Sequence, residues 1–340
     1  MHQTSFYLLF SIYCLCTADI TGPLSDDFQQ WLTSNGYQSD DFVRADYGTQ
    51  GSYGGRTASA STVSHTPVVF IHGNSDAALH LSKTATGWSN TIEYFLDKGY
   101  TQAELYATSW GDTNTLNAAK RTHNCRDLLR LRRFVLAVLA YTGAPKVSLI
   151  THSMGVTLGR KLIKGGAVDG PDGSCNLGTP LTSKVDVFLG LAGGNFGLCA
   201  CEGTGTLEPT CNKKNGFWPG DSCGLNTLTC GLSPLPFPCN GPTYSSLLMS
   251  MNTDNVREAS FVFSAWSLAD DLILYADEVW GRPTSLIPTS SGKVVYKLYT
   301  HMQTKEDTAA DQYTMVALKT LPSASDKKIS AFITTDGGSE

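Results

Sequence analysis

A serine in the pentapeptide T-H-S-M-G, residues 151–155, is the side chain best placed for chemistry in this sequence of 340 residues. The short apolar run before it, residues 146–150, predicts a buried strand, and apolar residues at helical spacing follow over residues 156–164. Ser153 therefore lies on a tight turn between a strand and a helix. Serine hydrolases use such a turn to expose a nucleophilic Oγ.

The small residue Gly155 lets the predicted strand and helix approach each other closely at this turn. The turn usually has glycine two residues before the serine as well, but this chain has Thr151 there. We therefore expect the strand and helix to be packed differently around Thr151.

A serine nucleophile needs a general base, and the base needs an acid that orients it. The expected chain order is serine, then aspartate or glutamate, then histidine. His301 is the only histidine after Ser153, and it follows the predicted strand 293–299, so we predict that it is the base. Asp270 and Asp271 follow another predicted strand and are the candidates for the acid. Because adjacent side chains point in different directions, only one of them can face His301.

Two backbone N–H groups are expected to stabilise the oxyanion in such a site. One comes from the residue after the nucleophile, which is Met154, and the other from the loop after an early strand. Residues 66–73 predict that strand and end in His72-Gly73, so Asn74 is the candidate for the second donor. His152 cannot easily bend back to the neighbouring serine, and we predict that it has a packing role.

The charge pattern excludes one class of function, and the first residues indicate a compartment. The net charge is −5 and no basic tract occurs, so nucleic-acid binding is not expected. The apolar run 6–16 is too short to cross a bilayer and small residues follow it, which predicts a signal peptide, residues 1–18. No other apolar segment of the sequence is long enough to span a membrane either. We therefore expect a secreted, extracellular protein without a transmembrane segment.

The cysteine content agrees with export to an oxidising compartment. An even number of cysteines would remain after cleavage: Cys125, Cys175, Cys199, Cys201, Cys211, Cys223, Cys230 and Cys239. They predict up to four disulfides, with the pairing left open. Cys199 and Cys201 are too close together to be an ordinary pair of zinc ligands, and no histidine lies nearby. We predict neither a metal nor an organic cofactor.

Composition changes sharply over residues 196–243, which are rich in Cys, Gly and Pro and have no clear period. Such a segment cannot build its own core, so we expect disulfides to hold it as a cap over the site. It carries several large apolar residues: Phe217, Trp218, Leu225, Leu228, Leu232, Leu235 and Phe237. These residues either line an acyl groove or an interface, or bury themselves against the main domain, and the sequence favours neither role.

Strands that alternate with helices predict an α/β fold, in which a mostly parallel sheet is covered by helices on both faces. The predicted organisation is an N-terminal extension, 19–66, and a main domain, 67–340, that contains the cap. The remaining predicted strands are 104–110, 185–191 and 260–266, and the predicted helices are 25–32, 88–98, 121–141, 244–251 and 307–319. Residues 47–62 are predicted to be irregular and 322–340 to be peripheral.

Arg126, Arg130 and Arg133 share one face of the predicted helix 121–141. Three arginines on one face could form a membrane-binding patch. The patch is short and the net charge of the chain is negative, so we expect a solvated face instead.

Four segments together resemble the class 2 lipase family, which includes small secreted bacterial lipases and nematode-type triacylglycerol lipases. They are residues 67–73, 151–155, 189–195 and 267–270, and the resemblance covers about residues 66 to 301. It implies an α/β-hydrolase core and lipid esters as substrates, with the acid at Asp270 and Asp271 as runner-up. The chain departs from the family at Thr151, where a small residue is usual. The cap is not covered by the resemblance.

These observations predict a secreted triacylglycerol lipase that uses Ser153, Asp270 and His301 to form and hydrolyse an acyl-enzyme. Its partner is a lipid ester substrate, met at a lipid–water interface. A carboxylesterase, thioesterase or acyltransferase with the same triad is the nearest rival function. Two functions without catalysis also fit the sequence: a catalytically dead, secreted lipid-binding protein, and a recognition module whose residues 196–243 bind a partner.

Overall fold

The computed structural model describes residues 20–204, 207–220, 230–231 and 243–333. The predicted signal peptide, residues 1–18, lies outside the described residues. So do several residues of the predicted cap: Cys223, Leu225, Leu228, Leu232, Leu235, Phe237 and Cys239. In the part of the chain that is described, no helix is both long and apolar enough to cross a membrane.

The centre of the molecule is an eight-stranded sheet with the order β1-β3-β2-β4-β7-β8-β11-β12. The six inner strands run parallel to one another, and β1 and β12 pair antiparallel at the two edges. The strands are β1 (Ser52–Tyr53), β2 (Val68–Ile71), β3 (Leu105–Thr108), β4 (Val147–His152), β7 (Val185–Leu191), β8 (Phe261–Ser267), β11 (Gly292–Tyr296) and β12 (Lys328–Phe332).

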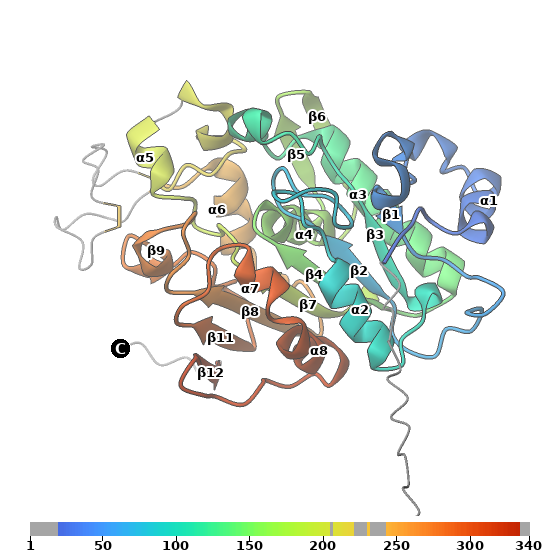
Figure 1. Cartoon of the computed structure of the whole chain (residues 1–340). Coiled ribbons are helices and arrows are strands. Elements are labelled where there is room, and N and C mark those ends of the chain that lie inside the picture. Colours follow the sequence, from blue (N-terminus) through green and yellow to red (C-terminus); the bar gives the residue numbers. More distant parts are fainter. Residues whose placement is uncertain (1–19, 205–206, 221–229, 232–242, 334–340) are drawn as a thin grey trace, which may run out of the picture.

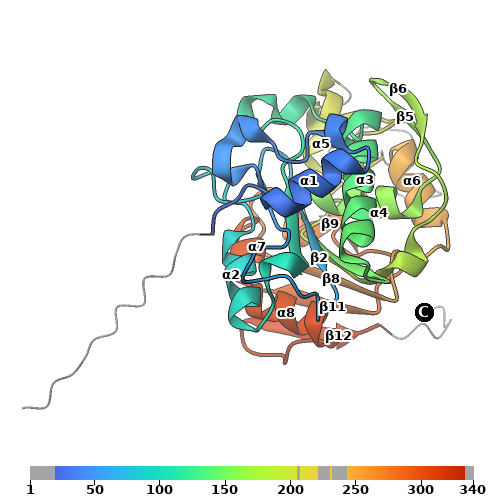
Figure 2. The same cartoon turned by 90° about the vertical axis from the view of Figure 1, so that its right-hand side faces the viewer.

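Helices cover both faces of the sheet because its inner strands are apolar on both sides. In β2, Val68 and Phe70 belong to one apolar cluster, whereas Val69 and Ile71 belong to another. The first cluster includes residues of α2 and α8, and the second includes residues of α1, α3, α4 and α6 on the opposite face (Figure 1, Figure 2). These helices are α1 (Asp26–Ser34), α2 (Ser89–Asp97), α3 (Cys125–Thr142), α4 (Met154–Lys164), α6 (Ser246–Thr253) and α8 (Ala309–Ala317).

Three parts of the sequence form structure that the prediction missed. The segment predicted to be irregular contains β1, which pairs with β3, and the tail predicted to be peripheral contains β12, which pairs with β11. A hairpin of β5 (Ala167–Gly170) and β6 (Gly173–Asn176) follows α4. These strands are short, and β12 and the hairpin are only partly buried, so they lack the long apolar runs by which inner strands are recognised.

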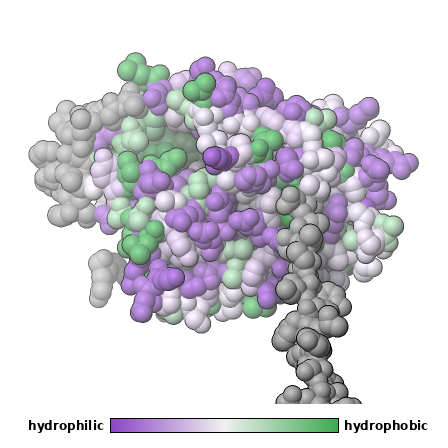
Figure 3. Space-filling view, in the orientation of Figure 1, coloured by the Kyte–Doolittle hydropathy of each residue, from purple (hydrophilic) through white to green (hydrophobic). Residues whose placement is uncertain are grey.

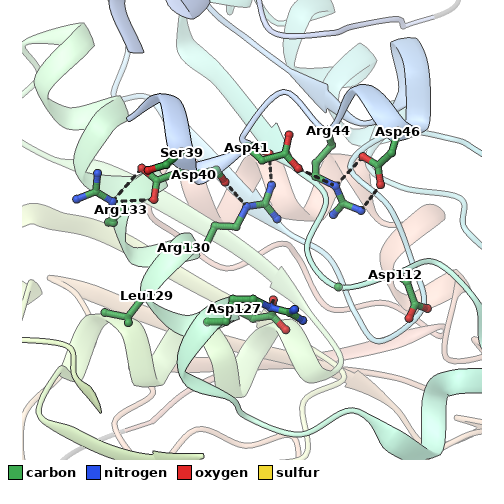
Figure 4. A pocket seen from close by; sticks show the side chains of 12 residues that line it. Ser39, Asp40, Asp41, Arg44, Asp46, Asp112, Asp127, Leu129, Arg130 and Arg133 are labelled. Carbon is green, nitrogen blue, oxygen red and sulfur yellow. Dashed lines mark hydrogen bonds and ion pairs between the residues drawn. The ribbon is translucent and has the colours of Figure 1, made fainter. Parts of the chain in front are cut away.

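The expectation of a solvated arginine face on α3 is wrong for Arg130, and Arg133 is only partly exposed. The N-terminal extension docks on this face, where Arg133 pairs with Asp40 at 2.8 Å (Figure 4). Arg130 donates to the backbone oxygens of Asp40 and Asp41. The side chain of Arg126 is 77% exposed, and that of Arg133 is 43% exposed. The guanidinium groups therefore hold the extension, which a helical pattern alone does not reveal.

The described part of the predicted cap lies after β7 and includes the short helix α5 (Ala200–Thr204). Disulfides join Cys199 to Cys230 and Cys201 to Cys211 within it. A third disulfide, Cys125–Cys175, joins the start of α3 to the hairpin. The structure thus confirms the expected disulfide-rich insertion, in a stretch with little regular secondary structure.

The chain order of the strands decides where polar side chains gather. The chain moves from β2 to β3 on one side and then returns to place β4 on the other side of β2. In open parallel sheets, ligands bind beyond the carboxyl ends of the strands at such a reversal. The segments that follow β2, β4, β8 and β11 therefore begin at the same edge of the sheet, and they carry every residue that the sequence predicted for the site.

Candidate active site

Ser153 lies between β4 and α4 in a backbone conformation that residues other than glycine rarely adopt, with φ 54° and ψ −128°. The turn also passes very close to the loop after β2. A Cβ atom at Gly155 would lie 2.5 Å from the backbone oxygens of Ile71 and His72, and one at Gly73 would lie 2.8 Å from the Cβ of Ser153. Glycine is therefore required at both positions for the serine to stand at this edge.

Thr151 is accommodated by a glycine on the helix. Its Oγ1 donates to the backbone oxygen of Leu189 in β7 at 2.8 Å. Its methyl group points at Gly159 of α4, where an added Cβ atom would lie only 3.0 Å away. In the usual turn, a glycine at position 151 gives the strand and helix room to approach each other. Here Gly159 on the helix gives that room, and this is the different packing that Thr151 was expected to require.

His301 and Asp270 are joined in the structure. The Nδ1 of His301 lies 2.7 Å from Oδ2 of Asp270, and both side chains are buried. The backbone N–H groups of Leu272 and Ile273 donate to Oδ1 of Asp270 at 2.9 and 2.8 Å. Burial raises the pKa of Asp270, but His301 and these N–H groups outweigh it, so the pKa lies below the usual aspartate value. The carboxylate is therefore ionised at neutral pH.

Asp271, the runner-up for the acid, contacts the backbone of His301 and not its imidazole. Its Oδ1 accepts a hydrogen bond from the backbone N–H of His301 at 2.9 Å, and its side chain is exposed. The two carboxylates thus hold His301 at two different atoms.

The Nε2 atom of His301 is buried and has no hydrogen-bond partner among the described residues. Ser153 and His301 line the same cavity of about 500 Å³. Nε2 is thus the nitrogen of the imidazole that is free to exchange a proton inside this cavity.

His152 anchors the histidine segment through its backbone. Its Nε2 lies 3.1 Å from the backbone oxygen of His301, and the centroids of the two imidazole rings are 4.6 Å apart. Burial lowers the pKa of His152 well below that of free histidine, so the ring is neutral and donates to this oxygen. The packing role expected for His152 thus includes a specific contact that sequence reasoning did not identify.

The loop after β2 is held from outside the sheet. Arg121 donates to Oδ1 of Asn74 and to Oγ of Ser75, and Nδ2 of Asn74 donates to the backbone oxygen of Ala118 at 3.0 Å. Ser75 has a φ of 63°, which is rare for a residue with a side chain. Asn74 and Met154 both line the cavity beside Ser153, where the two proposed oxyanion donors are required. Arg121 was not singled out from the sequence, because nothing local marks it.

The rest of the cavity wall is largely apolar and comes partly from the cap. Its lining includes Gly73, Ala118, Ala119, Ala192, Gly194, Leu198, Glu208, Thr210, Phe217, Leu272, Ile273 and Met302. Phe217 is 4% exposed and also packs on His123, with ring centroids 5.2 Å apart. Phe217 is therefore buried, which is one of the two roles considered for the apolar residues of the cap, and it also lines the cavity. Trp218 is buried but does not line it.

Several solved structures of lipases are similar to this chain at low sequence identity. Lipase B of Aspergillus fumigatus shares 10% identity with it, with a TM-score of 0.46, over 77% of this chain and 54% of that one. The lipase BlEst2 of Bacillus licheniformis in its propeptide form shares 12% identity, with a TM-score of 0.46, over 81% and 54%. A monoacylglycerol lipase of Paleococcus ferrophilus shares 14% identity, with a TM-score of 0.41, over 75% and 97%. This chain spans about half the length of the first two.

The match to a protein family is more specific. The family model for class 2 lipases matches residues 65–314, which include the site and most of the sheet. The predicted fold class, an α/β-hydrolase fold with a disulfide-rich insertion, is confirmed. The chain belongs to the class 2 lipase family.

Proposed function

We propose that this chain is a secreted triacylglycerol lipase with Ser153 as nucleophile, His301 as general base and Asp270 as the orienting acid. The observation that supports it most is the arrangement in one apolar cavity of the strained serine and the free Nε2 of an imidazole bound to a buried carboxylate. Each of these features is what acyl transfer by a serine requires.

In the proposed reaction, Ser153 Oγ attacks the ester carbonyl while Nε2 of His301 accepts its proton. The negative charge on the carbonyl oxygen is stabilised by the N–H groups of Met154 and Asn74, each contributing about 3 kcal/mol. His301 then protonates the departing alcohol, and water releases the acid by the reverse steps. Asp270 keeps the proton on Nδ1 and stabilises the imidazolium. No step requires a cofactor.

An apolar surface around the cavity supports a lipid ester as the substrate. Leu207, Leu272, Leu274 and Tyr275 are exposed, Leu272 lines the cavity, and Leu207 precedes Glu208, which lines it too. Figure 3 shows apolar residues gathered on one side of the face, beside the part drawn in grey. Such a surface fits contact with a lipid–water interface. The disulfides fit an oxidising, extracellular compartment.

The test is hydrolysis of p-nitrophenyl esters of short and long acids and of an emulsified triacylglycerol by the oxidised protein. Ser153→Ala should abolish hydrolysis of all of them, and Ser59→Ala, at an exposed serine, should not change it. Activity on short esters alone would identify a carboxylesterase, and activity on thioesters alone a thioesterase. No hydrolysis by folded wild type would refute the proposal and favour a lipid-binding role.

A further inference from the structure

Lys305 and Asp76 form a buried ion pair beside the candidate site. The Nζ of Lys305 lies 2.6 Å from Oδ2 of Asp76, and only 1% and 4% of the two side chains are exposed. They are 229 residues apart in the sequence. Neither residue has a part in the acyl-transfer steps proposed above.

The two residues belong to the two segments whose relative position the proposed reaction depends on. Asp76 is two residues after Asn74, in the loop that would supply an oxyanion donor, and it lines the cavity. Lys305 is four residues after His301, in the short helix α7 (Gln303–Glu306). The ion pair therefore connects the oxyanion loop directly to the segment that carries the base.

Further hydrogen bonds fix the geometry of both charged groups. The second carboxylate oxygen of Asp76 accepts from the backbone N–H groups of Ala77 and Gly87 at 2.9 and 2.8 Å. Lys305 also donates to Oγ1 of Thr86 at 3.0 Å, and Thr86 donates in turn to the carboxylate of Glu306. The ammonium lies 5.6 Å from the centre of the Trp88 ring. Little freedom remains for either side chain.

A buried ion pair is a costly way to stabilise a fold, which suggests that this pair has a further role. Burial raises the pKa of Asp76, but the charge of Lys305 outweighs it and lowers the pKa to about 2, so this carboxylate is ionised at neutral pH. Taking two charges out of water costs free energy that their attraction only partly offsets, and apolar residues of similar volume often stabilise a fold as well. What an apolar pair lacks is a fixed direction and distance between two loops.

We propose that Lys305 and Asp76 are positioning residues that set the oxyanion loop at its working distance from His301. This inference depends on the proposed function. The pair touches no reacting atom; it acts through Asn74 on one side and His301 on the other. Its loss should therefore lower kcat and leave KM nearly unchanged, because the acyl-binding wall remains.

The experiment compares Asp76→Asn, Lys305→Met and the double variant with wild type, as full-length oxidised protein acting on p-nitrophenyl esters. Active sites are counted by titration with a fluorophosphonate, so that kcat refers to reactive enzyme only. Each single variant should lose about 10- to 100-fold in kcat, as small misplacements of catalytic groups do. The double variant should lose no more than the worse single variant, since both residues act as one unit.

Lys164→Met is the matched control. Lys164 is also buried and pairs with Glu258 at 3.7 Å, but it lies at the far end of α4, away from the cavity. It should lower the melting temperature and leave kcat per active site at the wild-type value. Thr86→Val, which removes one acceptor of Lys305, gives a milder variant if a single variant does not fold.

A kcat close to wild type in folded Asp76→Asn and Lys305→Met, or in Thr86→Val and the double variant, would overturn the inference and leave the pair a stabilising role only. Failure of the proposed function would look different. In that case wild type itself would be inactive, or Ser153→Ala would still be active.

Discussion

At the scale of single residues, the two adjacent carboxylates after β8 have separate contacts with one histidine. Asp270 is buried and binds the imidazole, whereas the exposed Asp271 binds the backbone N–H of the same residue. A carboxylate on Nδ1 selects the tautomer that leaves Nε2 able to accept a proton. A carboxylate on the backbone N–H can only restrain the position of the segment.

This difference predicts unequal effects of two matched substitutions. Asp270→Asn should lower kcat about 10⁴-fold, because the amide favours the wrong imidazole tautomer. Asp271→Asn keeps an acceptor for the backbone N–H, so kcat should fall far less. The measurement is kcat for a p-nitrophenyl ester with both folded variants at neutral pH. Similar losses in both variants would contradict the assignment of Asp270 as the orienting acid.

At the scale of elements, the close packing of β4, α4 and the loop after β2 positions Ser153, the proposed nucleophile. Gly155 and Gly73 allow two backbone segments to pass without side chains between them, and Gly159 receives the methyl group of Thr151. A helix with glycine at both of its positions 155 and 159 is intrinsically weak, because glycine costs about 1 kcal/mol relative to alanine. Tertiary packing therefore outweighs helix propensity in α4.

Gly159→Ala should consequently destabilise the protein by about 1 to 3 kcal/mol, although alanine favours helix. The added methyl group would meet Thr151 at 3.0 Å and Phe188 at 3.1 Å, and both neighbours are buried. Chemical unfolding measures the change. Thr151→Ser removes the methyl group and keeps the hydroxyl, so it should restore part of the loss when combined with Gly159→Ala. No destabilisation by the single substitution would show that the strand and helix can separate here.

At the scale of the whole molecule, three histidines are buried among the packed layers and held in the neutral form. Burial lowers the pKa of His72 to about 4 and that of His123 to about 4, and it lowers the pKa of His152 well below that of free histidine. His72 accepts from the backbone N–H of Trp110, and His123 accepts from Thr157. Each contact uses a ring nitrogen that would be protonated in acid.

The free energy of unfolding should therefore fall as the pH drops below about 6.5, the value for free histidine. In the unfolded chain, the two histidines bind protons as the pH drops below about 6.5. In the folded protein, His72 and His123 bind protons only near pH 4. Their contribution to stability is therefore fully present above about pH 6.5 and is lost as the pH falls toward 4. Each of the two contributes up to about 3 kcal/mol to this loss. Chemical unfolding at three pH values between about 7.5 and 5 measures the slope.

His123→Gln supplies the control for this pH dependence. The variant is expected to be less stable than wild type above the pKa of free histidine, since a buried contact is lost, but its stability should depend less steeply on pH. An unchanged slope would mean that His123 does not titrate between folded and unfolded states in this range.

The sequence by itself determined the inner strands, the turn at Ser153 and the order of the candidate residues. Each of these has a local signal: an apolar run such as residues 185–191, a serine between a strand and a helix, and one histidine after that serine. Local signals work there because buried strands and tight turns restrict residue types over a few consecutive positions.

Only the tertiary structure decided which partners meet across the molecule. It separates the contacts of Asp270 from those of Asp271, docks the N-terminal extension on Arg130, and brings Lys305 to Asp76 across 229 residues. The edge strands β1 and β12 likewise form because a neighbouring strand is present to pair with. The physical reason is common to all of them: these contacts join segments that approach each other only after the sheet has formed, so no run of adjacent residues encodes them.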